Sequence, residues 1–254
     1  MLSGQFQEKE ILRHGLICLR LILMQQRDQS SGLRPFEEIQ QIVEQRVCEI
    51  KQEDPSLYYR IGDEIGRGSF AKVFKVKRIA DGHTAVLKYT GPSNVERQDT
   101  INECSLIKEL PSENIIGCED VFDSKGRIWV ILEYMDDDLS KVVLKRQDQY
   151  SEAFCKYTLY CVAQGLKSMH ERGVLHRDIK SENILIRKNG EIKISDLGLS
   201  VFLHEKQMFR NSLKGTINWF SPEIASGTFY SKEVDVWAFG CLAYELATGK
   251  PPFI

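Results

Sequence analysis

"LHRDIKSENILI", residues 175–186, is the stretch that decides the fold. Apolar residues with the composition of β-strands stand on both sides of a polar centre, whose members are His176, Arg177, Asp178, Lys180, Glu182 and Asn183. Turns between strands normally use Gly, Asn or Ser, and they seldom hold so many ionisable groups. Two interpretations are open at this point, a functional site on a loop or a solvated turn.

Bulk composition narrows the class of protein. The chain has 254 residues, of which 28% are charged and 42% hydrophobic, and its formal net charge is −2. This is a globular composition, and the balanced charge gives no general attraction to nucleic acid or to anionic membranes. The 7 cysteines include no CxxC pair, which favours a reducing compartment over a disulfide framework. No signal peptide is evident and the apolar stretch 15–24 is too short to cross a bilayer, so we expect a cytoplasmic protein.

The beginning of the chain is predicted to be a helical extension covering residues 1–55. Residues 10–26 have the composition of an amphipathic helix, and residues 36–50 place apolar side chains at three- and four-residue spacings after Pro35. The simpler interpretation is that the helix over 36–50 packs on the domain that follows. The alternative is that it binds a partner or a second copy of the chain.

The remainder of the chain changes from β-rich to helical. Residues 56–135 contain short strand-like segments separated by Gly and Asp, with one helix predicted over 95–110. Residues 136–254 begin with an acidic run and are mainly helical, with long helices predicted over 154–173 and 233–249. No internal repeat or low-complexity region interrupts this order. We therefore predict an α+β fold with a β-rich lobe followed by a helical lobe.

Two carboxylates and an amide follow one another on loops of the helical lobe. Asn183 comes five residues after Asp178, and Asp196 follows the strand-like sequence "EIKIS" directly before Leu197 and Gly198. Carboxylate and amide oxygens suit a hard cation such as Mg²⁺, with phosphate oxygens in its remaining positions. A carboxylate not bound to the metal can accept a proton from a hydroxyl group. Taken singly, each residue is also ordinary in a turn.

Upstream motifs add a phosphate-binding pattern. The sequence "GRGSFAKV", residues 66–73, resembles G-x-G-x-x-G-x-V with Ala71 at the third glycine position. Paired glycines let backbone amides approach phosphates closely, although this motif alone is equally a hairpin turn. Lys88 stands on a half-buried strand and needs a counter-charge, for which Glu103 in the next helix is the natural partner.

Taken together and in this order, the motifs resemble those of a eukaryotic protein kinase over residues 59–254. The later segments "GTINWFSPE" (215–223) and "DVWAFG" (235–240) extend the resemblance. It implies a two-lobed kinase fold, with ATP and Mg²⁺ as cofactors and protein hydroxyl groups as acceptors. Lys180 is typical of serine/threonine kinases rather than tyrosine kinases, and Thr216 agrees with this.

The resemblance also implies a role for each site residue. Asp178 would accept the hydroxyl proton, Lys180 would neutralise the transferred phosphate, and Asn183 and Asp196 would bind Mg²⁺. Lys88, positioned by Glu103, would hold the α- and β-phosphates. Leu132 would be the gatekeeper beside the adenine. The nucleotide would be bound by Ile65, Gly66, Gly68, Ser69, Val73, Ala85, Lys88, Glu133, Met135 and Leu185.

Regulation and specificity can be predicted from the same resemblance. Ser212 stands where many such kinases are phosphorylated, and Arg177 would be its counter-charge; the alternative is an ordinary loop serine. Glu182 and Glu245 match positions that bind arginine upstream of the target residue in basophilic kinases, which predicts a preference for basic substrates. The apolar stack of active kinases would consist of Ile107, Cys118, His176 and Leu197.

Residues 37–70 resemble the segment before the Gly-rich loop in PAK-like kinases of the sterile-twenty group. No segment matches their GTPase-binding motif, so regulation by a small GTPase does not carry over. Ser221 stands in place of Ala in the A-P-E element, a mild departure.

The chain ends at Ile254, where members of the family continue with further helices, so we expect an incomplete helical lobe. Glu223 would then lack its usual arginine partner, and the helix with Trp237 and Leu242 would lose its apolar cover. This keeps a second class of function open, that of a catalytically weak nucleotide-binding or scaffold fragment.

Overall fold

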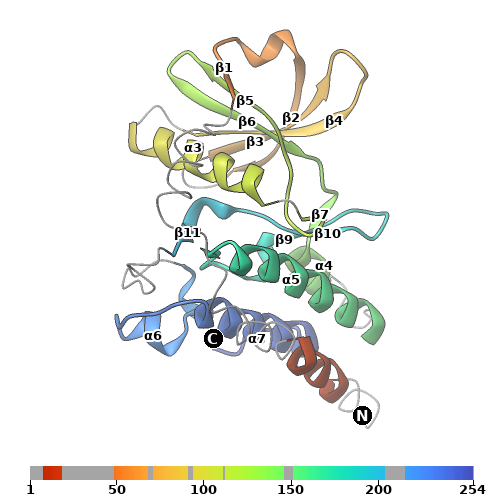
Figure 1. Ribbon diagram of the computed structural model, residues 1–254. Helices are drawn as coiled ribbons and strands as arrows, with labels where there is room; N and C mark the ends of the chain where they lie inside the picture. Colours follow the sequence, from red (N-terminus) through yellow and green to blue (C-terminus); the bar gives the residue numbers. More distant parts are fainter. Residues whose placement is uncertain are drawn as a thin grey trace. The chain divides into compact units, whose positions relative to one another are not determined.

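The structure is a computed structural model that describes residues 8–18, 49–67, 71–90, 94–110, 112–145, 151–203 and 215–253 (Figure 1). These residues divide into two compact units. We call residues 49–110 and 116–134 the sheet unit, and residues 8–18, 112–115 and 135–253 the helical unit. Each unit is described by itself.

The sheet unit is built on six strands in the order β1-β5-β6-β4-β3-β2. All neighbouring strands are antiparallel except β1, which runs parallel to β5. A single 3₁₀ turn, η1 (Pro55–Leu57), connects β1 to β2 and is capped by the Asp54 side chain. The strands are β1 (Ile50–Lys51), β2 (Tyr59–Arg67), β3 (Ala71–Arg78), β4 (Thr84–Thr90), β5 (Cys118–Ser124) and β6 (Arg127–Glu133).

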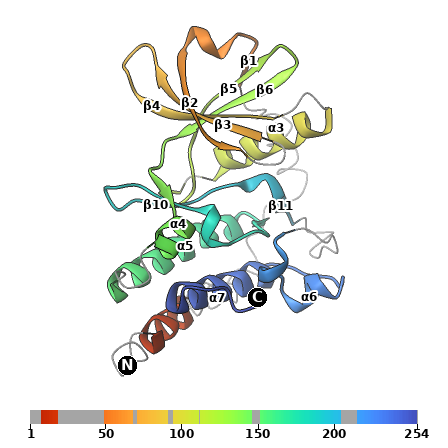
Figure 2. The same ribbon diagram turned by 180° about the vertical axis from the view of Figure 1, so that it is seen from behind.

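One helix, α3 (Asn94–Glu109), lies on one face of this sheet, as Figures 1 and 2 both show. It ends just before Pro111, which cannot continue a helix because its nitrogen carries no hydrogen. The apolar cluster between α3 and the sheet contains Ile101, Cys104, Val121, Ile128 and Val130. A second cluster contains Tyr59, Val76, Ala85, Leu87, Phe122 and Ile131.

The helical unit is organised around α5 (Glu152–Glu171) and α7 (Glu233–Thr248), which pack against each other. Ser151 caps the start of α5 through its hydroxyl oxygen, and Gly249 ends α7 in the left-handed conformation at φ 76°. Its other elements are α4 (Leu139–Lys145), β7 (Asp137–Asp138), β8 (Val174–Leu175), η2 (Ser181–Asn183), β9 (Ile184–Ile186), β10 (Ile192–Ile194), η3 (Leu197–Leu199), β11 (Val201–Phe202), η4 (Ile217–Trp219) and α6 (Pro222–Ala225).

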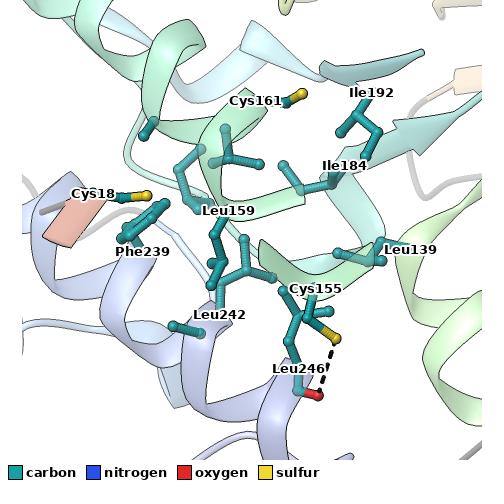
Figure 3. Close-up of a cluster of buried hydrophobic side chains, with 14 of the residues drawn as sticks. Cys18, Leu139, Cys155, Leu159, Cys161, Ile184, Ile192, Phe239, Leu242 and Leu246 are labelled. Carbon is teal, nitrogen blue, oxygen red and sulfur yellow. Dashed lines mark hydrogen bonds between the residues drawn. The ribbon is translucent and has the colours of Figure 1, made fainter. Parts of the chain in front are cut away.

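The helical residues 8–18 belong to the core of this unit. Ile11 and Cys18 are buried in the same cluster as Leu159, Phe239 and Leu242, and Figure 3 shows Cys18 beside Phe239. A Cβ atom on Gly15 would lie 3.1 Å from Cβ of Ala243, so a larger residue would require this segment or α7 to move by a few tenths of an ångström.

The structure corrects the expectations about the end of the chain in part. Leu242 is fully buried, in part because residues 8–18 pack on α7, and Trp237 stacks on Phe253 with ring centroids 5.9 Å apart. Leu242 consequently has cover within the described part of the chain, whereas Trp237 stays 36% exposed despite its contact with Phe253. Glu223 lies exposed in the first turn of α6, where a negative charge is favourable, so it is not a buried unpaired charge.

The predicted α+β class is confirmed, with an antiparallel-dominated sheet unit and a helical unit. The helix predicted over 36–50 is wrong at its end, because Ile50 is in strand β1; residues 36–48 lie outside the described residues. Within the residues that the structure describes, no helix is long and apolar enough to cross a membrane.

Candidate active site

The Lys88 side chain stands on a central strand of the sheet unit. β4 lies between β3 and β6, and Lys88 is opposite Val73 on one side and Val130 on the other. Lys88 Nζ lies 3.0 Å from Glu103 Oε1 and 3.2 Å from Oε2. The side chains of Lys88 and Glu103 are 19% and 9% exposed, so each charge compensates the other where water is scarce. The contact predicted from the sequence is present.

The described residues of the Gly-rich motif lie in the hairpin formed by β2 and β3. Gly66 on β2 is opposite Val73 on β3, and Ile65 is exposed beside it. Gly68 and Ser69 lie outside the described residues. Because Val73 lies opposite both Gly66 on β2 and Lys88 on β4, the hairpin brings one part of the predicted nucleotide set together.

Further predicted nucleotide contacts lie at the other end of β4. Ala85 is fully buried and stands opposite Glu133 on β6, with half-buried Leu132 next to it. The Glu133 carboxylate accepts a hydrogen bond of 2.6 Å from the Gly117 backbone N–H, which fixes the end of β6. The backbone of Glu133, to which the sequence assigned adenine binding, also donates from its N–H to the Gly117 carbonyl.

In the helical unit the polar stretch 176–183 forms a loop between β8 and β9, with Asp178 at its centre. Asp178 Oδ1 accepts from the Thr216 hydroxyl at 2.6 Å, and Oδ2 accepts from Asn183 Nδ2 at 2.9 Å and lies 2.8 Å from Lys180 Nζ. Burial alone would raise the pKa of Asp178, but the bonds from Lys180, Thr216 and Asn183 outweigh it and hold the pKa below its ordinary value. Asp178 is therefore an ionised acceptor at neutral pH.

Lys180 and Thr216 form a polar triangle with Asp178. Lys180 Nζ donates to Thr216 Oγ1 at 2.6 Å, while the Thr216 hydroxyl donates to Asp178. An ammonium group, a hydroxyl group and a carboxylate thus meet at one point, although Thr216 is far from the loop in sequence. This is a place where a hydroxyl group is bound next to both a proton acceptor and a positive charge.

The backbone of the loop is hydrogen-bonded to Asp235, a residue of α7 that is fully buried. Its carboxylate accepts from the backbone N–H groups of His176 at 2.9 Å and Arg177 at 2.7 Å, and it lies 2.8 Å from His170 Nε2. Burial raises the pKa of Asp235, but the hydrogen bonds and the charges of His170 and His176 outweigh burial and lower the pKa overall. These bonds stabilise Arg177 at φ 68°, a conformation that non-glycine residues seldom adopt.

His176 connects this loop to the strand that carries Asp196. The Asp178 N–H donates to His176 Nδ1 at 3.2 Å, so Nε2 carries the hydrogen and donates to the Ser195 carbonyl at 3.0 Å. Ser195 in turn donates to the Asn183 carbonyl from both its backbone N–H and its hydroxyl. Asp196 follows directly, exposed and at φ 59°. These bonds bring the Asn183 and Asp196 loops together.

Asn183 and Asp196 have the donor atoms that the predicted Mg²⁺ requires. Asn183 Nδ2 donates to the backbone carbonyl and to the carboxylate of Asp178, and the amide oxygen is the atom able to coordinate a cation. The Asp196 carboxylate is exposed. Within the described ranges no group of three or more His, Cys, Asp or Glu side chains forms a metal cluster. Two protein oxygens suit Mg²⁺, which keeps several waters and binds substrate phosphates.

Comparison with known proteins adds an independent observation to this geometry. Residues 59–254 match the family model described as protein kinase domain. The chain belongs to the protein kinase family. The resemblance predicted from the sequence is thereby confirmed.

The kinase has relatives of several types. It is 36% identical over 200 residues to an Aurora kinase of Eremothecium gossypii, and the aligned region covers 77% of this chain and 54% of the relative. It is 32% identical over 214 residues to serine/threonine-protein kinase shk1/pak1 of Schizosaccharomyces pombe, covering 83% of this chain and 32% of the relative. It is 32% identical over 263 residues to serine/threonine-protein kinase pakA of Dictyostelium discoideum, covering 100% and 22%.

PAK-type kinases are among the relatives, as the sequence predicted, and Aurora kinases are also among them at slightly higher identity. The chain spans just over half of the Aurora relative's length and about a third or less of the two PAK-type relatives.

The predicted regulatory pair falls only partly on the described residues of the kinase. Ser212 lies outside them. Arg177 is buried, with Nε donating to the Leu199 carbonyl at 2.7 Å and a terminal nitrogen donating to the Tyr230 hydroxyl at 3.1 Å. Its guanidinium thus holds the segment after Asp196 near α6. The counter-charge role for phosphorylated Ser212 stays a prediction.

Two predicted adenine contacts lie in the helical unit. Met135 is buried at the start of this unit, and half-buried Leu185 lies in the centre of β9, opposite Lys193 on β10 and Asp138 on β7. Leu185 therefore lies in the three-stranded sheet formed by β7, β9 and β10, and Met135 comes just before β7 in the sequence.

Glu245 is the buried member of the predicted substrate-binding acids. Its Oε1 accepts from the Ser181 hydroxyl at 2.7 Å, whereas buried Oε2 has no hydrogen-bond partner among the residues that the structure describes. Burial and, to a lesser extent, the neighbouring charge of Glu182 raise the pKa of Glu245, against the opposing bonds from Ser181. Glu182 itself is exposed. Ser181, which sequence reasoning missed, therefore holds Glu245 at the base of the Asp178 loop.

Proposed function

We propose that this chain is an ATP- and Mg²⁺-dependent protein serine/threonine kinase, which transfers the γ-phosphate of ATP to a hydroxyl group of a protein substrate. The observation that carries the proposal is the Asp178 carboxylate. It is ionised by its surroundings and bonded to a hydroxyl group and an ammonium group at 2.6 Å and 2.8 Å. A family member with this arrangement has the acceptor that hydroxyl phosphorylation requires.

Asp178 would orient the substrate hydroxyl group and accept its proton. The Thr216 hydroxyl now bonded to Asp178 Oδ1 has the same chemistry as the acceptor of a Ser or Thr substrate, which supports this role. Lys180, bonded to both, would neutralise charge on the transferred phosphate.

Lys88 would hold the α- and β-phosphates, and Glu103 would position Lys88 through the pair at 3.0 Å. Mg²⁺, when bound, neutralises charge on the phosphates. Asn183 and Asp196 would hold it through their side-chain oxygens, which fit a hard cation. The remaining nucleotide-binding residues would be Ile65, Gly66, Gly68, Ser69, Val73, Ala85, Glu133, Met135 and Leu185.

Protein substrates with basic residues upstream of the target are favoured by the acids at 182 and 245. Glu245 Oε2, buried and without a hydrogen-bond partner in the described part of the chain, supports this preference because a guanidinium or ammonium group would satisfy it. Phosphorylation of Ser212, with Arg177 as counter-charge, is proposed as the regulatory step of a signalling kinase. The 6 described cysteines are free, which supports a cytoplasmic location.

The test is Mg²⁺-dependent transfer from γ-labelled ATP to peptides that differ only in a Ser, Thr or Tyr acceptor. We expect labelled phosphate on Ser and Thr but not on Tyr, and no transfer after chelation of the metal. Lys88→Met should abolish transfer, whereas Lys77→Met, a matched change of an exposed lysine on β3, should preserve it. ATP binding without transfer by the unmodified chain would contradict the proposal and favour a nucleotide-binding scaffold.

A further inference from the structure

A short segment before the matched kinase region is built into the sheet unit. The family match begins at Tyr59, yet β1 at Ile50–Lys51 pairs in parallel with β5, opposite Val121 and Phe122. Lys51 Nζ lies 2.6 Å from Asp120 Oδ1, and the Tyr59 hydroxyl donates to the other oxygen of Asp120 at 2.6 Å. The backbone pairing of two residues and a partly buried ion pair thus fasten this segment to β5.

The same segment reaches α3 through an apolar contact. Ile50 packs in the cluster that contains Ile101 and Cys104 of α3 together with Val121 and Val130 of the sheet. Cys104 is fully buried there. Any shift of α3 away from the sheet would therefore expose Cys104 and separate it from Ile50.

A polar contact joins α3 to β5, the strand on which the segment pairs. Arg97, near the start of α3, donates from both terminal nitrogens to the Asp123 carboxylate on β5, at 2.9 Å and 2.5 Å. The Arg97 guanidinium holds the pKa of Asp123 below its ordinary value, and the nearby Gln52 side chain contributes to a lesser extent. The Arg97 and Asp123 side chains are 27% and 19% exposed, so the pair is partly shielded from water. A two-pronged bond of this kind fixes orientation as well as distance.

Arg97 and Glu103 are on one rigid helix. Six residues at 1.5 Å of rise separate them by about 9 Å along its axis. A tilt that moves the start of α3 therefore moves Glu103, whose contact with Lys88 at 3.0 Å tolerates little displacement.

We propose that Ile50, Arg97 and Asp123 form a brace that positions α3 and so sets the contact between Glu103 and Lys88. Arg97 and Asp123 are positioning residues, and strand β1 makes Ile50 and Lys51 part of the catalytic unit although they precede the matched kinase region. This inference rests on the proposed function only in its kinetic consequence, because the placement of α3 is measurable without catalysis.

The kinetic test is a double-mutant cycle between the brace and the pair that it positions. Arg97→Gln and Asp123→Asn should each lower kcat/KM for peptide phosphorylation by about 3- to 10-fold, the loss expected for a partly shielded charge pair. In a Glu103→Gln background the same changes should cost less than about twofold, because the contact that they support is already gone. Lys125→Ala is the matched control. It breaks the ion pair of Lys125 with Asp54 at 2.9 Å, at the β5–β6 turn, without touching α3.

The second readout is the rate at which a thiol reagent labels Cys104, with Cys155 as internal reference. Both cysteines are fully buried, and Cys155 lies in α5 of the helical unit. Arg97→Gln, Asp123→Asn and Ile50→Ala should each speed the labelling of Cys104 while Cys155 keeps its rate. Lys125→Ala should change neither rate.

Equal labelling of Cys104 in the unmodified chain and in Arg97→Gln would overturn the brace, and so would full additivity of Arg97→Gln with Glu103→Gln. If the unmodified chain transfers no phosphate, the proposed function fails while the Cys104 rate still decides the inference. Faster labelling of both cysteines would mean general destabilisation and would also contradict it.

Discussion

The Asp178 loop of the helical unit and the Lys88–Glu103 pair of the sheet unit are held in different ways. The loop rests on Asp235, which is fully buried and accepts two backbone N–H groups and a histidine. Glu103 reaches Lys88 from a helix whose start is fastened by a partly exposed ion pair to β5. Removing the charged acceptor of a buried network is costly, whereas partly exposed ion pairs contribute little.

This difference indicates which part of the kinase is adjustable. The proton acceptor is expected to keep its geometry until the helical unit unfolds, because its backbone conformation depends on a buried carboxylate. The placement of Glu103 is expected to change at lower cost, because the ion pair that holds the start of α3 is partly exposed to water. The predictions below test this comparison.

Asp178→Asn should cause the largest effect on chemistry. The amide keeps the size of the carboxylate but cannot accept a proton, so phosphate transfer should fall by about 10²- to 10⁴-fold. Single-turnover transfer and the melting temperature should be measured together, with Glu171→Gln at the exposed end of α5 as control. Transfer within about threefold of the unmodified chain would remove Asp178 from the proposed mechanism.

Asp235→Asn should cause the largest effect on stability. In the carboxylate, one oxygen accepts from the His176 N–H and the other from the Arg177 N–H. In the amide one of these atoms is a nitrogen, which cannot accept a hydrogen bond. The free energy of unfolding should therefore fall by about 3–5 kcal/mol. Urea unfolding of the helical unit measures this, and Glu233→Gln in the first turn of α7 is the control. A decrease in the free energy of unfolding of less than about 1 kcal/mol would contradict the view that Asp235 fixes the loop.

Glu103→Gln should lower transfer while leaving the fold intact. Loss of the charge that positions Lys88 is expected to reduce kcat/KM by about 10- to 100-fold, equivalent to about 1.4–2.7 kcal/mol in the transition state. The melting temperature should stay within about 3 °C because α3 keeps its apolar packing. Asp99→Asn, an exposed acid on the same helix, should leave both values unchanged. A large fall in melting temperature would mean that the pair is structural.

Glu245→Gln should have the smallest effect on stability, and that effect should depend on pH. The raised pKa of Glu245 means that the folded state favours the neutral carboxyl, so this group's contribution is full at low pH and is lost as pH rises through the raised pKa. The glutamine variant should therefore gain about 2–4 °C in melting temperature over the unmodified chain at about pH 7.5 and none at about pH 4. A gain of the same size at both pH values would contradict titration of Glu245.

Much of this arrangement could be predicted from the sequence where local pattern decides it. The strands around Lys88 and the long helices have clear periodicity, and a half-buried lysine requires an acid, which led to Glu103. The roles of the site residues stay predictions.

Other features depend on contacts distant in sequence. Asp235 was part of a quoted motif, yet only the fold brings it under His176 and Arg177; its one local signal is an acid inside an apolar helix. Strand β1 is too short to have a period, so Ile50 was assigned to a helix. The packing of residues 8–18 on α7 also escaped prediction, because an apolar face does not specify the surface that covers it.

Amide hydrogen exchange of the unmodified kinase tests the central comparison most directly. We predict that the amides of His176 and Arg177, which donate to buried Asp235, exchange only through unfolding of the helical unit. The amides of α3 should exchange faster, through local opening that leaves the sheet protected. Equal protection of α3 and the Asp178 loop, or faster exchange at His176 and Arg177, would contradict the account.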